Sequence, residues 1–108
     1  MFPKWERIAD VQIIAKSTLK AFWARHPWAE TPLRAWCVVA SRANWSGPAD
    51  IKAMFGADVD FVGDYRVIFD IGGNTYRFVV HVAYAYGRVL VKFAGTHADY
   101  DEIDAETV

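Results

Sequence analysis

The residues best suited to chemistry lie in the last third of the chain, between Tyr65 and Asp104. Three cations fall on strand-like segments there, and a histidine and a tyrosine follow the last segment: Arg77, Arg88, Lys92, His97 and Tyr100. Cationic side chains bind phosphate oxygens, and histidine exchanges protons near neutral pH because its reference pKa is about 6.5. This combination suits a protein that binds a phosphodiester and transfers protons around it.

Alternation of side chains predicts that Arg77 and His81 share one face of a strand. Antiparallel pairing with the next strand would bring Arg77 and Lys92 within a few positions of each other. Two cations on one face repel each other unless an anion lies between them, and Asp70 or a phosphate group could fill that place. In the alternative, Arg77 pairs with Asp70 or Asp64 and serves structure only.

The segment after the last strand has the pattern of a helix start. Thr96 can cap the helix, and Asp99 occupies the third helical position, as in a capping box. His97 and Tyr100 would then lie on one helical face. Such a helix would carry the later carboxylates away from the sheet, whereas a tail that folds back could shield the cations.

Other kinds of chemistry have little support in the sequence. Cys37 lies on the apolar face of a predicted helix and is expected in the core. His26 precedes a proline and His81 lies within an apolar strand, so neither is expected to be catalytic. No second group of ligands accompanies the acidic residues near the end, so we expect no metal and no cofactor. Gly72-Gly73 is a hairpin turn without a following helix, which excludes a phosphate-binding loop.

A strand and a first helix are expected at the start of the ordered chain. Val11–Ala15 is apolar and β-branched, as strands are, and Ser17 offers an N-cap hydroxyl. The apolar face of the helix follows at helical spacing: Leu19, Phe22, Trp23 and His26. Pro27 should end this helix, because the residue before proline avoids the α region.

Two more helices should follow, the first starting at Thr31-Pro32 and ending near Ala43-Asn44. Its inward residues are Leu33, Trp36, Cys37 and Ala40. A short helix after Ser46-Gly47-Pro48 should point Ile51, Met54 and Phe55 inward and end at Gly56. These stripes are expected in the core, because amphipathic helices bury such a face.

From Asp58 the pattern changes to that of an antiparallel meander with one face buried against helices. The expected strands are Val59–Val62, Tyr65–Ile71, Tyr76–Val82 and Val89–Phe93, with turns at Gly72–Asn74 and Tyr86-Gly87. On the last strand, Val89, Val91 and Phe93 should face the core, and Arg88, Leu90 and Lys92 the other side.

Composition favours one globular domain. The chain has 108 residues, of which 54% are hydrophobic, so it can bury one core and is not disordered. No apolar run approaches the roughly 20 residues of a membrane-spanning helix, and no apolar stretch of a secretory signal follows Lys4 and Arg7. A single cysteine cannot form an intramolecular disulfide. We expect a cytoplasmic protein of bacterial type without a membrane partner.

Charge is unevenly distributed along the chain. All 12 lysines and arginines lie within residues 1–97, against 8 acidic residues, whereas residues 98–108 hold 5 acidic residues and no base. A mildly basic body followed by an acidic tail fits a phosphate-containing partner. It equally fits an ordinary solvated surface with an acidic end.

Five segments in this order form a specific set: IIAKSTLKAFWARHP (13–27), PLRAW (32–36), ANWSGPADIKAMF (43–55), VIFDIGGNTYRFVVHV (67–82) and VKFAGTHADYDEIDAETV (91–108). With them, the chain resembles the HigB toxins of bacterial type II toxin–antitoxin systems, within the RelE-like group of mRNA-cleaving toxins. The likeness starts at Val11, so we expect a toxin domain over residues 11–108 and an N-terminal extension over residues 1–10.

The resemblance implies an α+β, RelE-like fold, with a curved, mainly antiparallel sheet, N-terminal helices on one face and a short C-terminal helix. It also implies an endoribonuclease that needs no metal, cuts mRNA in the ribosomal A site and so inhibits translation. The implied partner is an antitoxin of the HigA type, a helix-turn-helix DNA-binding protein. Many such toxins are strongly basic, and this chain is not.

Mapped onto this sequence, the family's functional residues give the catalytic candidates Arg77, Lys92, His97 and Tyr100. Lys52 and Arg66 are candidate RNA contacts, and Arg88, on the expected face of Lys92, is a third.

RNA itself supplies the nucleophile for the implied reaction, because the 2′-OH can attack the neighbouring phosphate. Arg77 and Lys92 would hold the phosphate and its developing charge. His97 would carry a proton, and Tyr100 would orient the 2′-OH or assist the base. Which of His97 and Tyr100 is base and which is acid is open.

Two other readings stay open at this stage. The same cationic sheet could bind RNA or an acidic protein without catalysis. Alternatively, the aromatic residues could line a pocket for a small ligand, with Arg77 turned outward.

Overall fold

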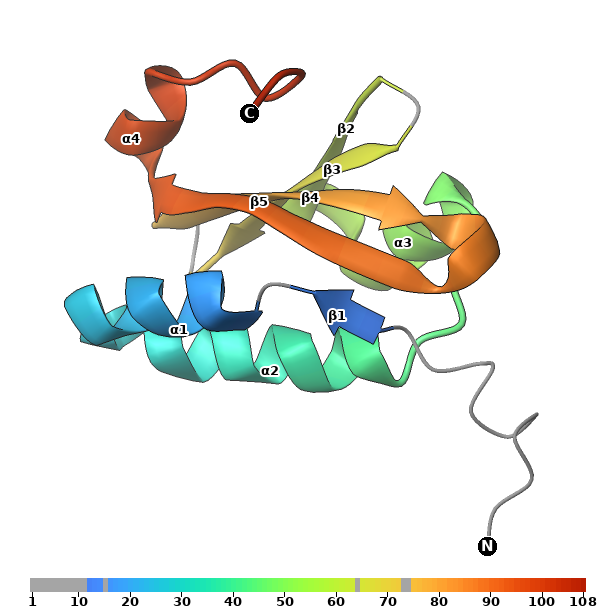
Figure 1. Cartoon of the computed structure of the whole chain (residues 1–108), viewed down its shortest axis with the longest axis horizontal. Helices are drawn as coiled ribbons and strands as arrows, with labels where there is room; N and C mark the ends of the chain where they lie inside the picture. The colour runs from blue at the N-terminus through green and yellow to red at the C-terminus, as the bar shows by residue number, and fades with distance from the viewer. Residues whose placement is uncertain (1–11, 15, 64, 73–74) are drawn as a thin grey trace, which may run out of the picture.

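The structure, a computed structural model, describes residues 12–14, 16–63, 65–72 and 75–108. These residues form a five-stranded sheet with helices on both sides (Figure 1). The strands are β1 (Gln12–Ile14), β2 (Val59–Val62), β3 (Arg66–Ile71), β4 (Tyr76–Ala83) and β5 (Arg88–Thr96). The helices are α1 (Lys16–Arg25), η2 (Pro27–Ala29), α2 (Glu30–Ser41), α3 (Pro48–Phe55), η3 (Gly56–Asp58), η4 (Tyr84–Tyr86) and α4 (His97–Asp101).

The strands lie side by side in the order β1-β5-β4-β3-β2. Neighbours from β2 to β5 are antiparallel, as the alternating pattern predicts, and the four expected strands are all present. After β1, the chain runs through the helices to the opposite edge of the sheet, where β2 starts the meander. The meander returns to β1, so that β5 pairs with β1 in parallel. The α+β, mainly antiparallel fold class is confirmed.

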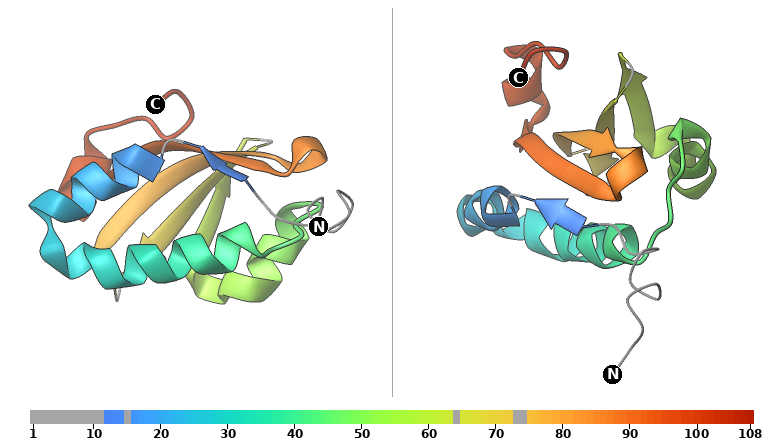
Figure 2. Two further views of the ribbon diagram at one scale, coloured as in Figure 1. Left: turned by 60° about the horizontal axis from the view of Figure 1, so that its bottom comes forward. Right: turned by 45° about the vertical axis from the view of Figure 1, so that its right-hand side comes forward.

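One face of the sheet packs on α1, α2 and α3 and holds the main core (Figure 2). Phe69, Phe78 and Trp36 meet at its centre. The ring centre of Phe78 lies 4.7 Å from that of Trp36 and 5.1 Å from that of Phe69. Burial of the helical stripes is confirmed for Leu19, Phe22, Leu33, Trp36, Ala40 and Ile51. No helix among the described residues is long and apolar enough to cross a membrane.

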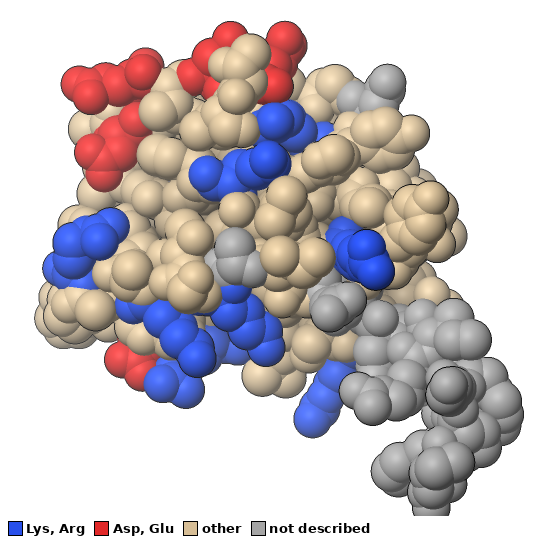
Figure 3. Space-filling model, in the orientation of Figure 1, with Lys and Arg blue, Asp and Glu red and all other residues tan. Residues whose placement is uncertain are grey.

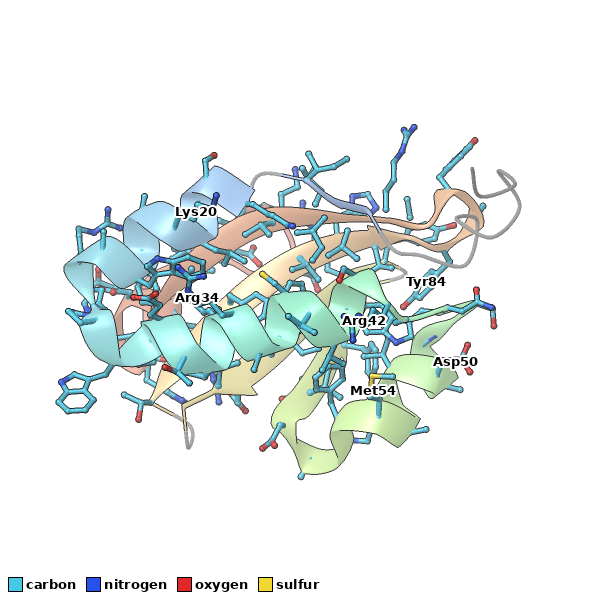
Figure 4. All side chains as sticks on the ribbon, turned by 90° about the horizontal axis from the view of Figure 1, so that it is seen from below. Lys20, Arg34, Arg42, Asp50, Met54 and Tyr84 are labelled. Carbon is cyan, nitrogen blue, oxygen red and sulfur yellow. The ribbon has the colours of Figure 1, made fainter. Side chains whose placement is uncertain are left out.

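Met54 is an exception to the predicted core. Its side chain is 50% exposed, although its spacing from Ile51 and Phe55 indicated an inward position. In the view from the helical side, Met54 lies on the outer surface of α3 (Figure 4). On this 8-residue helix, Ile51 and Phe55 are the residues that pack on the core.

Two predicted helix starts are wrong. Ser17 is the second residue of α1 rather than its cap. α2 begins at Glu30, because η2 runs directly into it, so Thr31 and Pro32 lie within its first turn. Proline is tolerated there, since the first N–H groups of a helix have no partner within it.

The last strand departs from simple alternation. Val91 pairs with Val80 and Phe93 with Val79, so Lys92 is an extra residue in a β-bulge. Beyond the bulge, Phe93 packs on the face opposite to the main core, which contradicts its predicted inward position.

Some expectations fall on residues that the structure does not describe. These are the N-terminal extension over residues 1–10, the ends of the first strand at Val11 and Ala15, and the hairpin residues Gly73 and Asn74. The division into an extension and a toxin domain therefore stays a prediction.

Candidate functional site

The sheet face away from α1 and α2 is only partly covered. α4 and the C-terminal segment, residues 102–108, lie over it (Figure 1). Beneath them is a small second apolar cluster: Ile68, Val79 and Ala105, with Val62, Phe93, Tyr100, Ile103 and Val108 packed around it. Polar side chains border this cluster along the strands.

Four of these polar residues meet at one end of the face, and we call them the Arg77 cluster: Asp70, Arg77, His97 and Tyr100. Arg77 Nε donates to Asp70 Oδ1 at 2.6 Å. The Arg77 guanidinium also lies over the ring of Tyr100, 4.8 Å from its centre. His97 Nε2 is 3.9 Å from Asp70 Oδ1. The guanidinium is therefore held in place by an anion and an aromatic ring.

Strand register and a helix cap assemble this cluster. Asp70 on β3 is the direct neighbour of Arg77 on β4. The predicted capping box is confirmed: Thr96 Oγ1 accepts from the Asp99 N–H at 3.2 Å, and Asp99 Oδ2 accepts from the Thr96 N–H at 3.1 Å. The hydrogen bonds from the backbone and side chain of Thr96 lower the pKa of Asp99. The cap fixes where α4 starts, and thus where His97 and Tyr100 lie.

Gly95 is a positioning residue that sequence reasoning missed. It is the β5 neighbour of Arg77 and is buried. A Cβ atom there would lie 2.6 Å from Cζ of Phe93 and 2.8 Å from Cβ of Asp99. The first turn of α4 can therefore approach the strand because residue 95 has no side chain. The only sequence signal is a glycine directly before the capping box.

Lys92 and Arg88 lie apart from the Arg77 cluster. Lys92 is half-buried in the bulge, three residues before Gly95, or about 10 Å along the strand at 3.3 Å per residue. Arg88 starts β5 at the far end, where its guanidinium lies 5.9 Å from the ring centre of Tyr86. Of the catalytic candidates, the structure thus brings together Arg77, His97 and Tyr100.

The remaining RNA-contact candidates lie on different faces. Lys52 is exposed on α3, which packs on the main-core side of the sheet. Arg66 lies on the same face as Arg77, where its Nη1 group donates to the main-chain oxygens of Val108 at 2.6 Å and Ala105 at 3.3 Å.

The acidic tail does not behave as expected. Instead of leaving the sheet, the chain folds back after α4, so that Ala105 is buried and Arg66 binds its main chain. Its carboxylates stay on the surface (Figure 3). Among the described residues, the carboxylate that pairs with Arg77 is Asp70, as the structural alternative predicted, and no tail carboxylate does so. The tail contacts Arg66 through the main-chain oxygens of Ala105 and Val108 rather than through its acidic side chains.

Among the described residues, no three His, Cys, Asp or Glu side chains lie close enough together to hold a metal ion. Cys37 is half-buried against the main core, and burial raises the pKa of its thiol. A thiol in that state is a poor nucleophile. The chemistry that the Arg77 cluster offers is binding of an anion and transfer of protons.

Comparison with known proteins identifies the family of this chain. The family model of the HigB toxins, described as the RelE-like toxic component of a toxin–antitoxin system, matches residues 29–103. The match spans β2 to β5 and includes every member of the Arg77 cluster. A search of curated proteins gave no match.

Proposed function

Since the chain belongs to the HigB family of RelE-like toxins in toxin–antitoxin systems, we propose that it is an endoribonuclease that cuts mRNA on the ribosome. The observation that carries this proposal is the Arg77 cluster. It combines an oriented guanidinium, an imidazole and a phenol on one partly covered sheet face.

The proposed reaction uses the 2′-OH of the RNA as the nucleophile. Its oxygen forms a new bond to the adjacent phosphorus while the bond from phosphorus to the 5′-oxygen breaks. One proton leaves the 2′-oxygen and one is delivered to the departing 5′-oxygen. The products are a 2′,3′-cyclic phosphate and a free 5′-OH, and no water is consumed in this step.

The residues of the cluster divide these tasks. Arg77 holds the phosphate and stabilises the charge that develops on its oxygens. The bond to Asp70 uses one of the five N–H donors of a guanidinium and so fixes the plane of the group. His97 transfers a proton, and Tyr100 orients the 2′-OH or assists that transfer. Lys92, further along the strand, adds positive charge toward the RNA backbone.

The proposed reaction needs no metal ion, because a guanidinium can stabilise the same charge that a metal would. We expect cleavage to continue with EDTA in excess, under conditions that keep ribosomes intact. Complete loss of cleavage in EDTA that a divalent ion restores would contradict this part of the proposal.

The test of the catalytic assignment is His97→Ala. We expect mRNA cleavage by the purified variant to fall by roughly 10²–10⁴-fold, the usual contribution of a general acid or base. RNA binding, measured by electrophoretic mobility shift, should persist. Cleavage at the wild-type rate by the folded variant would contradict the role of His97.

A second candidate function is binding of RNA or protein without catalysis. The ion pair between Arg77 and Asp70 favours it, because the carboxylate offsets part of the charge available to a phosphate. Wild-type protein that binds RNA but leaves it intact, on and off the ribosome, would establish this function instead.

An antitoxin partner follows from the family, and we propose that it is of the HigA type, with a helix-turn-helix DNA-binding domain. It would cover or distort the face that carries Arg77, bringing acidic or apolar residues to it. Inspection of the adjacent reading frame and co-purification test this proposal. A neighbouring gene of another class whose product neutralises the toxin would contradict it.

A further inference from the structure

A second polar site lies on the same sheet face as the Arg77 cluster, at the opposite end of the strands. It is an open pocket of about 330 Å³, lined by Val62, Gly63, Tyr65, Arg66, His81 and Glu106. Arg66 pairs with His81 across β3 and β4, as Asp70 pairs with Arg77. Four residues of strand separate these pairs, which is about 13 Å at 3.3 Å per residue. The two sites are far enough apart to hold different nucleotides of one RNA strand.

Aromatic rings form one wall of this pocket. The rings of Tyr65 and His81 lie 5.6 Å apart with planes inclined by 41°. Tyr65 is 54% exposed, so its ring is accessible to a ligand. Proteins recognise single-stranded RNA by stacking its bases on such aromatic side chains. The wall therefore offers a surface for a flat heterocycle.

The other walls carry a donor and an acceptor. Arg66 Nη1 donates to the main-chain oxygens of Ala105 and Val108, and this contact places Glu106, which lies between those two residues, at the pocket. A carboxylate has two acceptor oxygens, and arginine donates to paired acceptors. Guanine has groups that match both side chains. Its adjacent N–H donors on N1 and N2 match the carboxylate, and its acceptors O6 and N7 match the arginine. Adenine, cytosine and uracil do not combine them.

From this geometry, we propose that the pocket is a guanine-binding subsite that selects where the RNA is cut. The inference rests on the proposed ribonuclease function, because selection matters only if the RNA is cleaved. The base stacks on Tyr65 and His81, Glu106 accepts from its N1–H and N2–H groups, and Arg66 faces O6 and N7. The tail thus forms part of a recognition site.

Base binding can be measured without cleavage. Guanosine and adenosine 5′-monophosphate are titrated separately into the ¹⁵N-labelled protein, with backbone amide shifts as the readout. We expect the guanine nucleotide to shift the amide signals of Arg66 and His81. The adenine nucleotide should bind with a dissociation constant at least fivefold higher. Glu106→Gln and Tyr65→Leu should abolish the difference. Their matched controls, Glu102→Gln and Tyr86→Leu, should preserve it, since both residues are exposed and lie outside the pocket.

A cleavage assay provides the second test. Replacing guanosine by inosine, which lacks the N2 amine, at one position near the cut should slow the wild type roughly fivefold or more. The Glu106→Gln variant should cut both RNAs at equal rates.

The outcomes separate the two proposals. Cleavage without any preference for guanosine, together with equal shifts by both nucleotides, overturns the guanine subsite and leaves the ribonuclease function intact. Guanine-selective shifts at the pocket in a protein that cuts no RNA would support the base site and overturn the ribonuclease function.

Discussion

The two faces of the sheet are built from alternating residues of the same strands, yet they differ in what covers them. On one face, three helices bury a continuous set of aromatic and aliphatic side chains around Phe69 and Phe78. On the other, one short helix and the end of the chain cover a small cluster around Ile68 and Val79. The first face holds most of the apolar surface that stabilises the fold. The second leaves room at both ends for polar side chains.

This difference separates stability from function along single strands. On β4, Phe78 is fully buried among aromatic rings, whereas its neighbour Arg77 is only partly buried on the other face. Changes on the helical face should therefore affect folding first, and changes on the opposite face should affect activity first. The following variants test that division.

The largest effect on stability is expected from Phe78→Ala. Loss of this ring leaves a cavity beside Trp36 and Phe69 and should lower the free energy of unfolding by about 3–5 kcal/mol. Urea denaturation measures the change. Phe61→Ala is the matched control, because Phe61 is 36% exposed on the edge strand β2. An equal loss in both variants would contradict the assignment of the main core.

A smaller effect is expected from Gly95→Ala. The new methyl group must displace Phe93 and the first turn of α4, which should cost about 1–3 kcal/mol. Because His97 and Tyr100 move with α4, RNA cleavage should fall while the fold persists. Gly47→Ala is the control, since a Cβ atom at Gly47 meets nothing within 4 Å. Wild-type cleavage by the folded Gly95 variant would refute the positioning role.

Thr96→Ala removes the cap of α4 and should lower stability by about 0.5–2 kcal/mol. Thr18→Ala, at an exposed helical position, is the control.

The cap should also depend on pH. Because folding lowers the pKa of Asp99, its contribution is present above the ordinary pKa of 3.8 and is lost as pH falls through the lowered value. NMR can measure the order of α4 as pH falls. An α4 that stays equally ordered at low pH would argue against the capping box.

Deletion of Glu102–Val108 should not raise the rate of catalysis. The tail lies over Ile68 and Arg66 rather than on Arg77, so its loss should not release an inhibited site. We expect cleavage at equal folded concentration to stay level or to fall through lost packing of Ile103. Any preference for guanosine should be lost, because the deletion removes Glu106 and the main-chain partners of Arg66. A clear rise in rate would show that the tail is inhibitory.

Much of this division could be predicted from the sequence. The helical spacing of Leu33 and Trp36 and the alternation of Tyr76 with Phe78 indicate which face of each element is buried. Both patterns follow from the side-chain repeat of a single helix or strand. The capping box was equally clear, since Thr96 and Asp99 act locally. The catalytic candidates came from the residue types on the last strands and just after them, and the family resemblance supplied their roles.

The remaining features depend on contacts between distant parts of the chain. The bulge at Lys92 has no marker in sequence, and it moves Phe93 to the other face. The return of the tail depends on Ala105 and Val108, whose spacing shows no period. The contact of Arg77 with Tyr100 exists because α4 packs on Gly95, which a pattern within one element cannot reveal.

The sheet face that carries Arg77 should be the toxic one, and growth arrest tests this most directly. The wild type, Arg77→Ala and Arg42→Ala are induced without antitoxin, and growth and the amount of soluble folded protein are measured. Arg42 is an exposed arginine at the end of α2, on the helical side (Figure 4). We expect arrest by the wild type and the Arg42 variant and continued growth with the Arg77 variant. Folded Arg77→Ala that stops growth as fast as the wild type would contradict the account.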